Sequence, residues 1–130
     1  MPAPTPIDLA ATLAQFSDHW NPRLIAELNG QHRKLAKVEG ECVWHHHAHE
    51  DELFLVIHGT MRMDLQDGDG NERSETLTPG QLIVIPKGTE HRPASVGGEC
   101  SVLLFEPAGT LNTGTAEPGE LTRRTLERLD

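Results

Sequence analysis

The chain has 130 residues, of which 20 are Asp or Glu and 11 are Lys or Arg, so its formal net charge is −9 at pH 7. This acidic balance argues against nucleic acid and anionic membrane surfaces as partners, because clustered Lys and Arg side chains are needed to bind phosphate groups. A chain of this length has room for one hydrophobic core, so we expect residues 1–130 to form a single domain.

We expect a cytoplasmic protein that does not contact a membrane. The first Lys or Arg is Arg23, so the N-terminus lacks the charged region of a signal peptide. The longest apolar run, Leu53 to Ile57, is far too short to span a membrane. Cys42 and Cys100 lie in apolar surroundings and are interpreted as small buried side chains in a reducing compartment, with a disulfide between them left open.

Residues 1–22 are predicted to form a loose arm followed by one short helix. Thr5-Pro6-Ile7-Asp8 supplies a capping hydroxyl, a proline at the first helical position and an acid in the first turn. Apolar residues follow at Leu9, Leu13 and Phe16. Asn21-Pro22 stops the helix near Trp20, because a residue before proline is disfavoured in the helical region.

Residues 23–106 indicate a series of short strands separated by Gly and Pro. The predicted strands are 23–28, 32–38, 41–47, 52–58, 60–66, 73–78, 81–85, 91–95 and 100–106. This spacing leaves no room for crossover helices, which excludes a parallel α/β sheet and favours an all-β barrel or jelly roll. Residues 107–130 are predicted to be an irregular tail, with a short helix near the end that starts at Thr122.

Four of the eight histidines lie in WHHHAHEDELF, residues 44–54. Residues two apart on a strand share a face, so His45 and His47 project together and His46 projects away. Glu52 begins the next strand, and a set of two imidazoles and one carboxylate can hold a metal ion with open coordination positions. The alternative is a solvated histidine-rich loop that binds metal adventitiously.

A second stretch, residues 80–91, reads GQLIVIPKGTEH. It predicts a turn, a buried strand, a Pro-x-Gly turn and a histidine that begins the return strand. A lone histidine in such a place is usually structural. Here the turn can aim His91 into a barrel that already carries three candidate ligands.

The two stretches resemble the two signature motifs of the cupin superfamily. The first motif is H-x-H, three or four residues, Glu, six residues and Gly, and it is matched by His45, His47, Glu52 and Gly59. The second is Gly, five residues, P-x-G, two residues and His, and it is matched by Gly80, Pro86, Gly88 and His91. Two departures are Gly40, one residue closer to the first histidine than usual, and Ser95, where asparagine is usual.

The resemblance covers roughly residues 35–107, and more narrowly the chain is similar to small bacterial single-domain cupins, a group loosely labelled as related to phosphomannose isomerase. WHHH, DELF, EHRP and EPAGTLNTG carry this similarity. It implies a double-stranded β-helix (jelly-roll) barrel over residues 23–106, a homodimer, and one divalent metal held by His45, His47, Glu52 and His91. Iron, manganese, nickel, copper and zinc suit these ligands about equally, and a shifted set with His47 and His49 is an alternative.

Two classes of function are open. The first is a metal-dependent enzyme on a small oxygenated molecule, of the dioxygenase or sugar-isomerase type, with Glu50 and Asp51 at the rim as the candidate general bases. The second is a non-catalytic module that binds a small ligand or the metal. A metal-free barrel with vestigial histidines is a third, weaker reading.

The remaining polar and apolar patterns are given structural interpretations. Asp67 to Asn71 begins like a calcium loop but lacks its glycine and its final glutamate, so it is predicted to be a hairpin tip. Met61 and Met63 are expected to line the barrel, His58 to lie too far from Glu52 to be a ligand, and Arg92 to form an ion pair. The apolar outer face of residues 53–57 predicts sheet stacking or a dimer interface.

Overall fold

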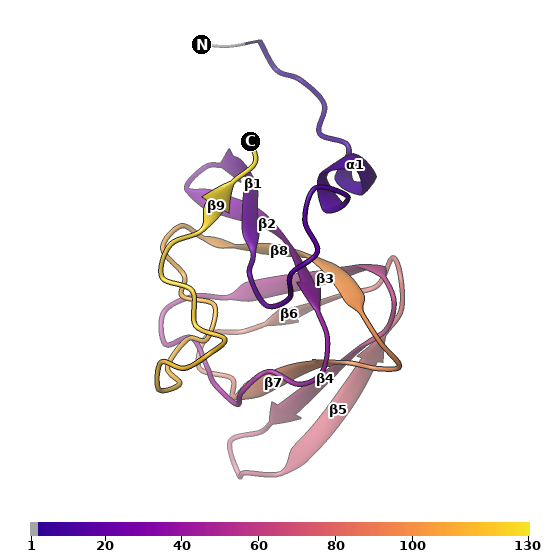
Figure 1. Ribbon diagram of the computed structural model, residues 1–130. Coiled ribbons are helices and arrows are strands. Elements are labelled where there is room, and N and C mark those ends of the chain that lie inside the picture. The colour runs from indigo at the N-terminus through magenta and orange to yellow at the C-terminus, as the bar shows by residue number, and fades with distance from the viewer. Residues whose placement is uncertain (1–2) are drawn as a thin grey trace.

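The computed structural model describes residues 3–130 and consists mainly of antiparallel strands, with one short helix, α1 (Leu9–Leu13), near the N-terminus (Figure 1). The strands in chain order are β1 (Arg23–Leu28), β2 (Gln31–Val38), β3 (Glu52–His58), β4 (Met61–Gln66), β5 (Glu72–Leu77), β6 (Leu82–Ile85), β7 (His91–Ser95), β8 (Cys100–Pro107) and β9 (Glu127–Arg128). The expected all-β jelly roll is confirmed.

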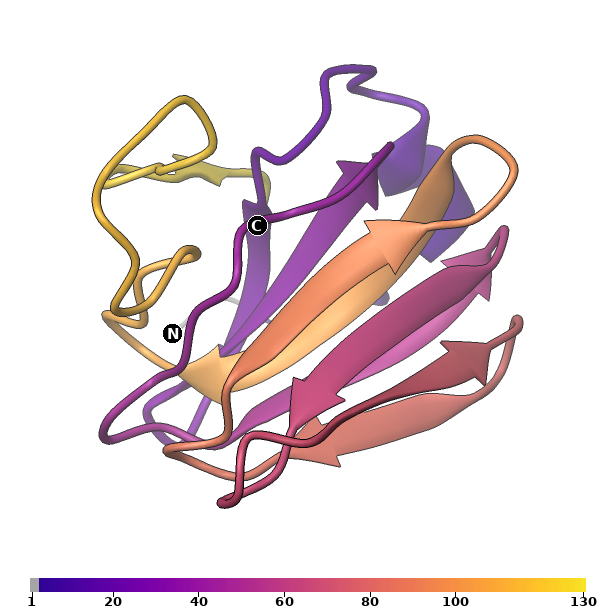
Figure 2. The same cartoon turned by 90° about the horizontal axis from the view of Figure 1, so that it is seen from below.

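The strands form two sheets that face each other across the core. The larger sheet has the order β6-β3-β8-β2-β1-β9 and the smaller has the order β5-β4-β7 (Figure 2). In β3 buried residues alternate with more exposed ones, as the period of two of a strand requires. The main core therefore combines side chains of both sheets: Ala36, Val38, Phe54, Val56, Met61, Met63, Leu65, Leu77, Ile85, Cys100, Val102 and Leu104.

The helix covers part of the outer face of the larger sheet. Its Leu13, together with Phe16, packs on Ile25 and Leu35 in a second apolar cluster. The helix is shorter than predicted and begins one turn later, because the side chain of Asp8, rather than Thr5, accepts the hydrogen bond from Ala11 N at 3.0 Å.

Two further predictions about local structure are wrong. Residues 41–47 do not form a strand and pair with β7 only through isolated bridges, Glu41 with Ala94 and His45 with His91. The chain around Thr122 follows turns and bends instead of a helix, and the last residues add β9 in parallel to β1. In the first place a continuous partner strand is missing, and in the second the pairing with β1 overrides the local sequence signal.

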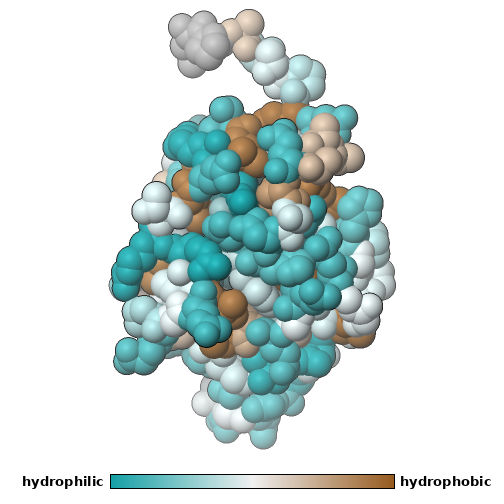
Figure 3. Space-filling model, in the orientation of Figure 1, coloured by the Kyte–Doolittle hydropathy of each residue, from teal (hydrophilic) through white to brown (hydrophobic). Residues whose placement is uncertain are grey.

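The hairpin tips and the surface follow the sequence more closely. Asp67 accepts hydrogen bonds from the backbone of Asp69 and Asn71, which confirms a polar turn between β4 and β5. Hydrophilic residues dominate the face drawn in Figure 3, with apolar residues gathered near α1. Within residues 3–130, no helix has both the length and the apolar character that a membrane crossing requires.

Candidate metal centre

Backbone hydrogen bonds bring the two histidine-bearing stretches together. His45 N donates to His91 O at 3.0 Å, and His91 N donates to His45 O at 2.8 Å. Gly88 N donates to His47 O at 2.8 Å, which ties the Pro-x-Gly turn to the same segment. Glu52 is the first residue of β3, and strand alternation puts its side chain on the face of β3 that points into the core.

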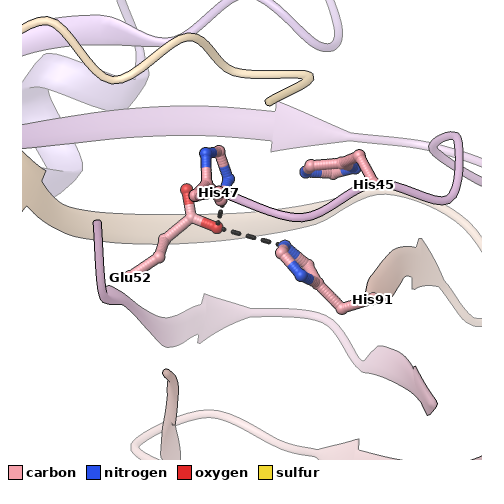
Figure 4. A group of neighbouring side chains, drawn as sticks. All are labelled: His45, His47, Glu52 and His91. Carbon is pink, nitrogen blue, oxygen red and sulfur yellow. Dashed lines mark ion pairs between the residues drawn. The ribbon is translucent and has the colours of Figure 1, made fainter. Parts of the chain in front are cut away.

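The side chains of His45, His47, Glu52 and His91 point toward one another inside the barrel (Figure 4). One ligand atom from each lies within 4.8 Å of the others, and all four residues are buried. Glu52 Oε1 lies 3.3 Å from His47 Nε2 and 3.4 Å from His91 Nε2. Two ligands at about 2.1 Å from one tetrahedral ion stand roughly 3.4 Å apart, so these spacings suit a single metal.

Three of these atoms are buried without a hydrogen bond in the described chain: His47 Nε2, Glu52 Oε1 and His91 Nε2. Leaving a buried polar atom unpaired costs about 1–3 kcal/mol, so three that face one another need an explanation. Hydrogen bonds at the other ring nitrogen fix the orientation of two imidazoles. His45 Nδ1 donates to Val43 O and His91 Nδ1 to Thr89 O, each at 2.8 Å. That tautomer leaves a lone pair on Nε2, which a metal requires.

The charge states within the cluster fit metal binding as well. Burial, reinforced by the neighbouring His91, lowers the pKa of His45 to about 4, so this imidazole is neutral at pH 7. Burial alone would raise the pKa of Glu52, but its contacts with Glu106, His47 and His91 outweigh burial and hold that pKa well below its usual range. A neutral imidazole and an ionised carboxylate are the forms that bind a divalent cation.

A second row of buried polar groups lies beside Glu52. Lys34 Nζ donates to Glu106 Oε1 at 2.7 Å, and the two side chains are 2% and 1% exposed. Burial, with the charge of Glu52 nearby, raises the pKa of Glu106 well above its usual range, while the Lys34 ammonium opposes this rise. Sequence reasoning missed this pair, although strand alternation places Lys34 with the inward Ala36 and Glu106 with the inward Leu104.

A small, mainly apolar cavity of about 40 Å³ adjoins the cluster. Its walls are His45, Glu52, Trp20, Pro22, Ala36, Val38, Cys42, Phe54, Met61, Pro93, Val102, Leu104 and Asn112. A water molecule needs about 10–15 Å³ by this kind of measure, so the cavity holds only a few waters or a comparably small group.

Cys42 and Cys100 are both free, and burial raises the pKa of each thiol to about 11.

Several candidate residues lie outside the cluster. His46 turns away and pairs with Glu90 at 2.8 Å, and His49 is exposed. Asp51 accepts a hydrogen bond from Lys87 N at 2.8 Å and so fastens the turn between β6 and β7. His58 is exposed at the far end of β3, as expected for a residue that is not a ligand.

Arg92 forms the structural ion pair predicted for it. It contacts Asp64 at 2.9 Å and Glu41 at 3.2 Å, and its guanidinium lies 4.9 Å from the ring centre of Trp44. Arg62 binds the same Asp64 from the other side through two hydrogen bonds. This network lies on the outer face of the smaller sheet and not in the cavity.

The two departures from the motif pattern compensate for each other. Gly40 N donates to Ser95 Oγ at 2.8 Å, and Ser95 N donates to Gly40 O at 2.9 Å. Gly40 adopts a φ of 80°, which suits glycine. The pair therefore closes the end of the segment that leads to His45.

Comparison with known proteins agrees with this geometry. Residues 32–106 match the sequence model of the Cupin domain, and the chain belongs to this family. A cupin-2 domain protein from Shewanella frigidimarina has a similar structure, with 44% sequence identity, a TM-score of 0.72 and a match that covers 78% of this chain and 93% of that one. Among curated proteins, the uncharacterized protein YdbB of Bacillus subtilis is 39% identical over 71 residues, which are 55% of this chain and 59% of YdbB.

A more distant likeness shows the fold alone. The structure of the hydroquinone 1,2-dioxygenase PnpCD in complex with Fe3+ matches with 22% identity and a TM-score of 0.68, over 78% of this chain and 32% of that one. A fold like that of this chain therefore forms about a third of that longer chain.

Proposed function

We propose that His45, His47, Glu52 and His91 bind one divalent transition metal, and that the barrel is a metal-dependent enzyme for a small oxygenated molecule. The observation that carries this proposal is the set of three buried atoms without a hydrogen bond that face one another at His47, Glu52 and His91. Building such a set into a core is costly unless a ligand satisfies it. A metal at this site would supply a Lewis acid or a point of attachment for dioxygen.

The residues around the proposed ligands support chemistry shielded from water. Phe54, Met61 and Leu104 present apolar surface to the cavity next to His45 and Glu52. Exclusion of water strengthens electrostatic interactions and protects reactive species from side reactions. The fold shared with a hydroquinone dioxygenase that holds Fe3+ makes the dioxygenase type one reasonable form of this proposal, beside the isomerase type.

A non-catalytic binding module is the second candidate, and the cavity wall favours it. Two of the ionisable residues in this wall are proposed ligands, and among the described residues Cys42 is the remaining one. Its pKa of about 11 makes the thiol a poor acid or base at pH 7. The amide of Asn112 is engaged with Leu121 O and Arg123 N. Catalysis would then depend on the metal and on groups of the substrate.

The assembly and location proposed for the protein follow from the surface and the thiols. Leu82 and Val84 on the edge strand β6 are 57% and 51% exposed, and they lie beside the half-buried outer residues of β3. We propose that this apolar face is the homodimer contact, as exposed apolar area of this kind marks interfaces. Two buried free cysteines agree with a reducing compartment such as the cytoplasm.

A substrate screen separates the two candidate functions. Wild-type protein loaded in turn with iron, manganese, nickel, copper and zinc is incubated with sugars, phenolic compounds and keto acids, with His47→Ala as the control. Turnover that needs both the metal and His47 supports the enzyme. Saturable binding without turnover for every pair supports the module, and metal-independent turnover would contradict the proposed site.

A further inference from the structure

The C-terminal tail contacts the candidate metal centre at Gly114. A Cβ atom added to Gly114 would lie 2.9 Å from His45 Cδ2 and would overlap the carbonyl of His46. Real Cβ atoms essentially never approach other atoms so closely, so the site accepts only glycine without rearrangement. Cδ2 is bonded to Nε2, so anything that pushes on Cδ2 moves the nitrogen that would bind the metal.

Thr115 holds the backbone next to His45 by direct hydrogen bonds. Thr115 N donates to His46 O at 3.0 Å, and His46 N donates to Thr115 Oγ1 at 3.2 Å. The same hydroxyl lies 3.2 Å from His46 Nδ1. Residues 41–47 have only isolated bridges to β7, so these contacts from the tail replace part of a missing strand ladder.

The turn that carries these contacts is itself anchored. We call residues 111–116 the closing turn; it is closed by Gly114 N to Leu111 O at 2.9 Å and Ala116 N to Thr113 O at 3.0 Å. Asn112 Nδ2 donates to Leu121 O at 2.6 Å, and Thr113 is 1% exposed with its hydroxyl 2.8 Å from that of Thr122. Figure 2 shows the tail passing beside the segment that leads from β2 to β3.

We propose that the closing turn is a positioning element of the metal centre, which fixes the His45 ring through Gly114 and the adjoining backbone through Thr115. The His45 imidazole is then bound at Nδ1 by Val43 O, and at its Cδ2 edge Gly114 leaves no room for a Cβ atom. This inference rests on the proposed metal site. It also gives a role to the last residues of the EPAGTLNTG stretch, which supply none of the proposed ligands.

The test compares two glycines of the tail that both have positive φ. Gly114 has a φ of 51° and Gly109 a φ of 87°, but a Cβ on Gly109 meets no atom within 4 Å among the described residues. Gly109→Ala therefore reports the backbone strain alone, whereas Gly114→Ala adds pressure on His45. The dissociation constant for Co2+ is measured by competition with a chromogenic chelator, with the visible spectrum of bound Co2+ as the second readout.

We expect Gly114→Ala to weaken Co2+ binding about 10–100-fold and to change the Co2+ spectrum, because groups that orient metal ligands typically contribute this much. Gly109→Ala is expected to keep the wild-type spectrum and a dissociation constant for Co2+ within about twofold of wild type. A twofold change is far smaller than the loss expected when a group that orients a metal ligand is disturbed. Equal affinity and identical spectra in the two folded variants would overturn the positioning role.

A second pair of variants covers the case in which Gly114→Ala does not fold. Thr115→Val removes the hydroxyl contacts to His46, and Thr125→Val makes the same change at an exposed tail residue. Thr115→Val should weaken Co2+ binding about tenfold, at the lower end of the range for such groups, and Thr125→Val should not. If wild type takes up Co2+ and Thr115→Val matches it, only this inference fails; if wild type takes up no metal, the proposed function fails with it.

Discussion

Two clusters of charged and ionisable residues lie on opposite sides of the smaller sheet, and they differ in how far their polar atoms are satisfied. On the outer face, Asp64 accepts hydrogen bonds from Arg62, Ser74 and Arg92. In the interior, His47, Glu52 and His91 each have a buried atom without a hydrogen bond. Both clusters are close-packed, so proximity of charged groups alone does not identify a ligand site. Three buried ligand atoms that lack hydrogen bonds and lie within 4.8 Å of one another do, because buried polar groups are normally hydrogen-bonded.

The largest effect is expected from the buried pair beside the interior cluster. Glu106→Leu removes the hydrogen-bond acceptor of Lys34, whose ammonium group would stay buried. Removing one partner of a buried ion pair costs about 3–5 kcal/mol, so the free energy of unfolding in urea should fall by that amount. The double variant Lys34→Met/Glu106→Leu should recover most of the loss, and additive losses would show that the two residues do not act as a pair.

The next largest effect is expected on metal binding, when a proposed ligand and its neighbour in sequence are each replaced. Metal binding contributes about 10–16 kcal/mol over four ligands in structural zinc sites, so loss of one ligand should cost roughly 2.5–4 kcal/mol. His47→Ala should therefore weaken metal binding about 100–1000-fold. His46→Ala, on the opposite face, is the control and should bind metal like wild type. The comparison fails if both variants bind equally well, measured by chelator competition.

The outer cluster should affect stability and leave metal binding unchanged. Asp64→Asn replaces a carboxylate that three side chains bind, and a hydrogen bond to a charged group contributes about 1.5–3 kcal/mol. We expect the free energy of unfolding to fall by about 2–3 kcal/mol at pH 7. A change in metal stoichiometry in this variant would contradict the separation of the two clusters.

The same residue gives a dependence on pH. Burial opposes ionisation of Asp64, but its hydrogen bonds with Arg62, Ser74 and Arg92 outweigh burial and lower its pKa. A lowered pKa contributes stability that is present above the unfolded value, near pH 4, and is lost as the pH falls through the folded value. Below pH 4 the wild-type apoprotein should lose stability toward that of Asp64→Asn, measured as urea unfolding between pH 6 and pH 2.5. A difference between the two that stays constant over this range would contradict the assignment.

The smallest effect concerns the aromatic ring at the edge of the outer cluster. The guanidinium of Arg92 lies over Trp44, and such contacts contribute about 0.5–1 kcal/mol at exposed sites. Trp44→Leu keeps an apolar side chain and should lower the free energy of unfolding by about this amount. Repeating the substitution in an Arg92→Gln background should remove most of the difference.

Several strands and the grouping of the proposed ligands could be predicted from the sequence, because the signals for both are local. Strands 52–58 and 91–95 were predicted with the bounds that the structure has, since alternation and turn residues define them. The four proposed ligands were grouped by alternation and by the motif, and the structure brings them together. The predicted strand 41–47 was wrong, yet an extended backbone is enough to put His45 and His47 on one side.

The parts that sequence reasoning missed depend on contacts between distant residues. Lys34 and Glu106 are 72 positions apart, and neither is unusual until β2 and β8 pair. Thr122 carries a good local capping signal, but the tail is fixed instead by Asn112 and by the pairing of β9 with β1. Gly114 reads as an ordinary loop glycine, and only the approach of His46 shows why a side chain does not fit.

The central claim is tested most directly by the metal content of untagged protein, measured by elemental analysis for wild type, His91→Ala and His58→Ala. His58 lies on β3 like Glu52 but is exposed, so it controls for the loss of a histidine. We predict about one equivalent of a divalent transition metal in wild type and in His58→Ala, and almost none in His91→Ala, as a site with three imidazoles and one carboxylate requires. One equivalent retained by His91→Ala, or no metal in wild type after anaerobic loading, would contradict the proposed centre.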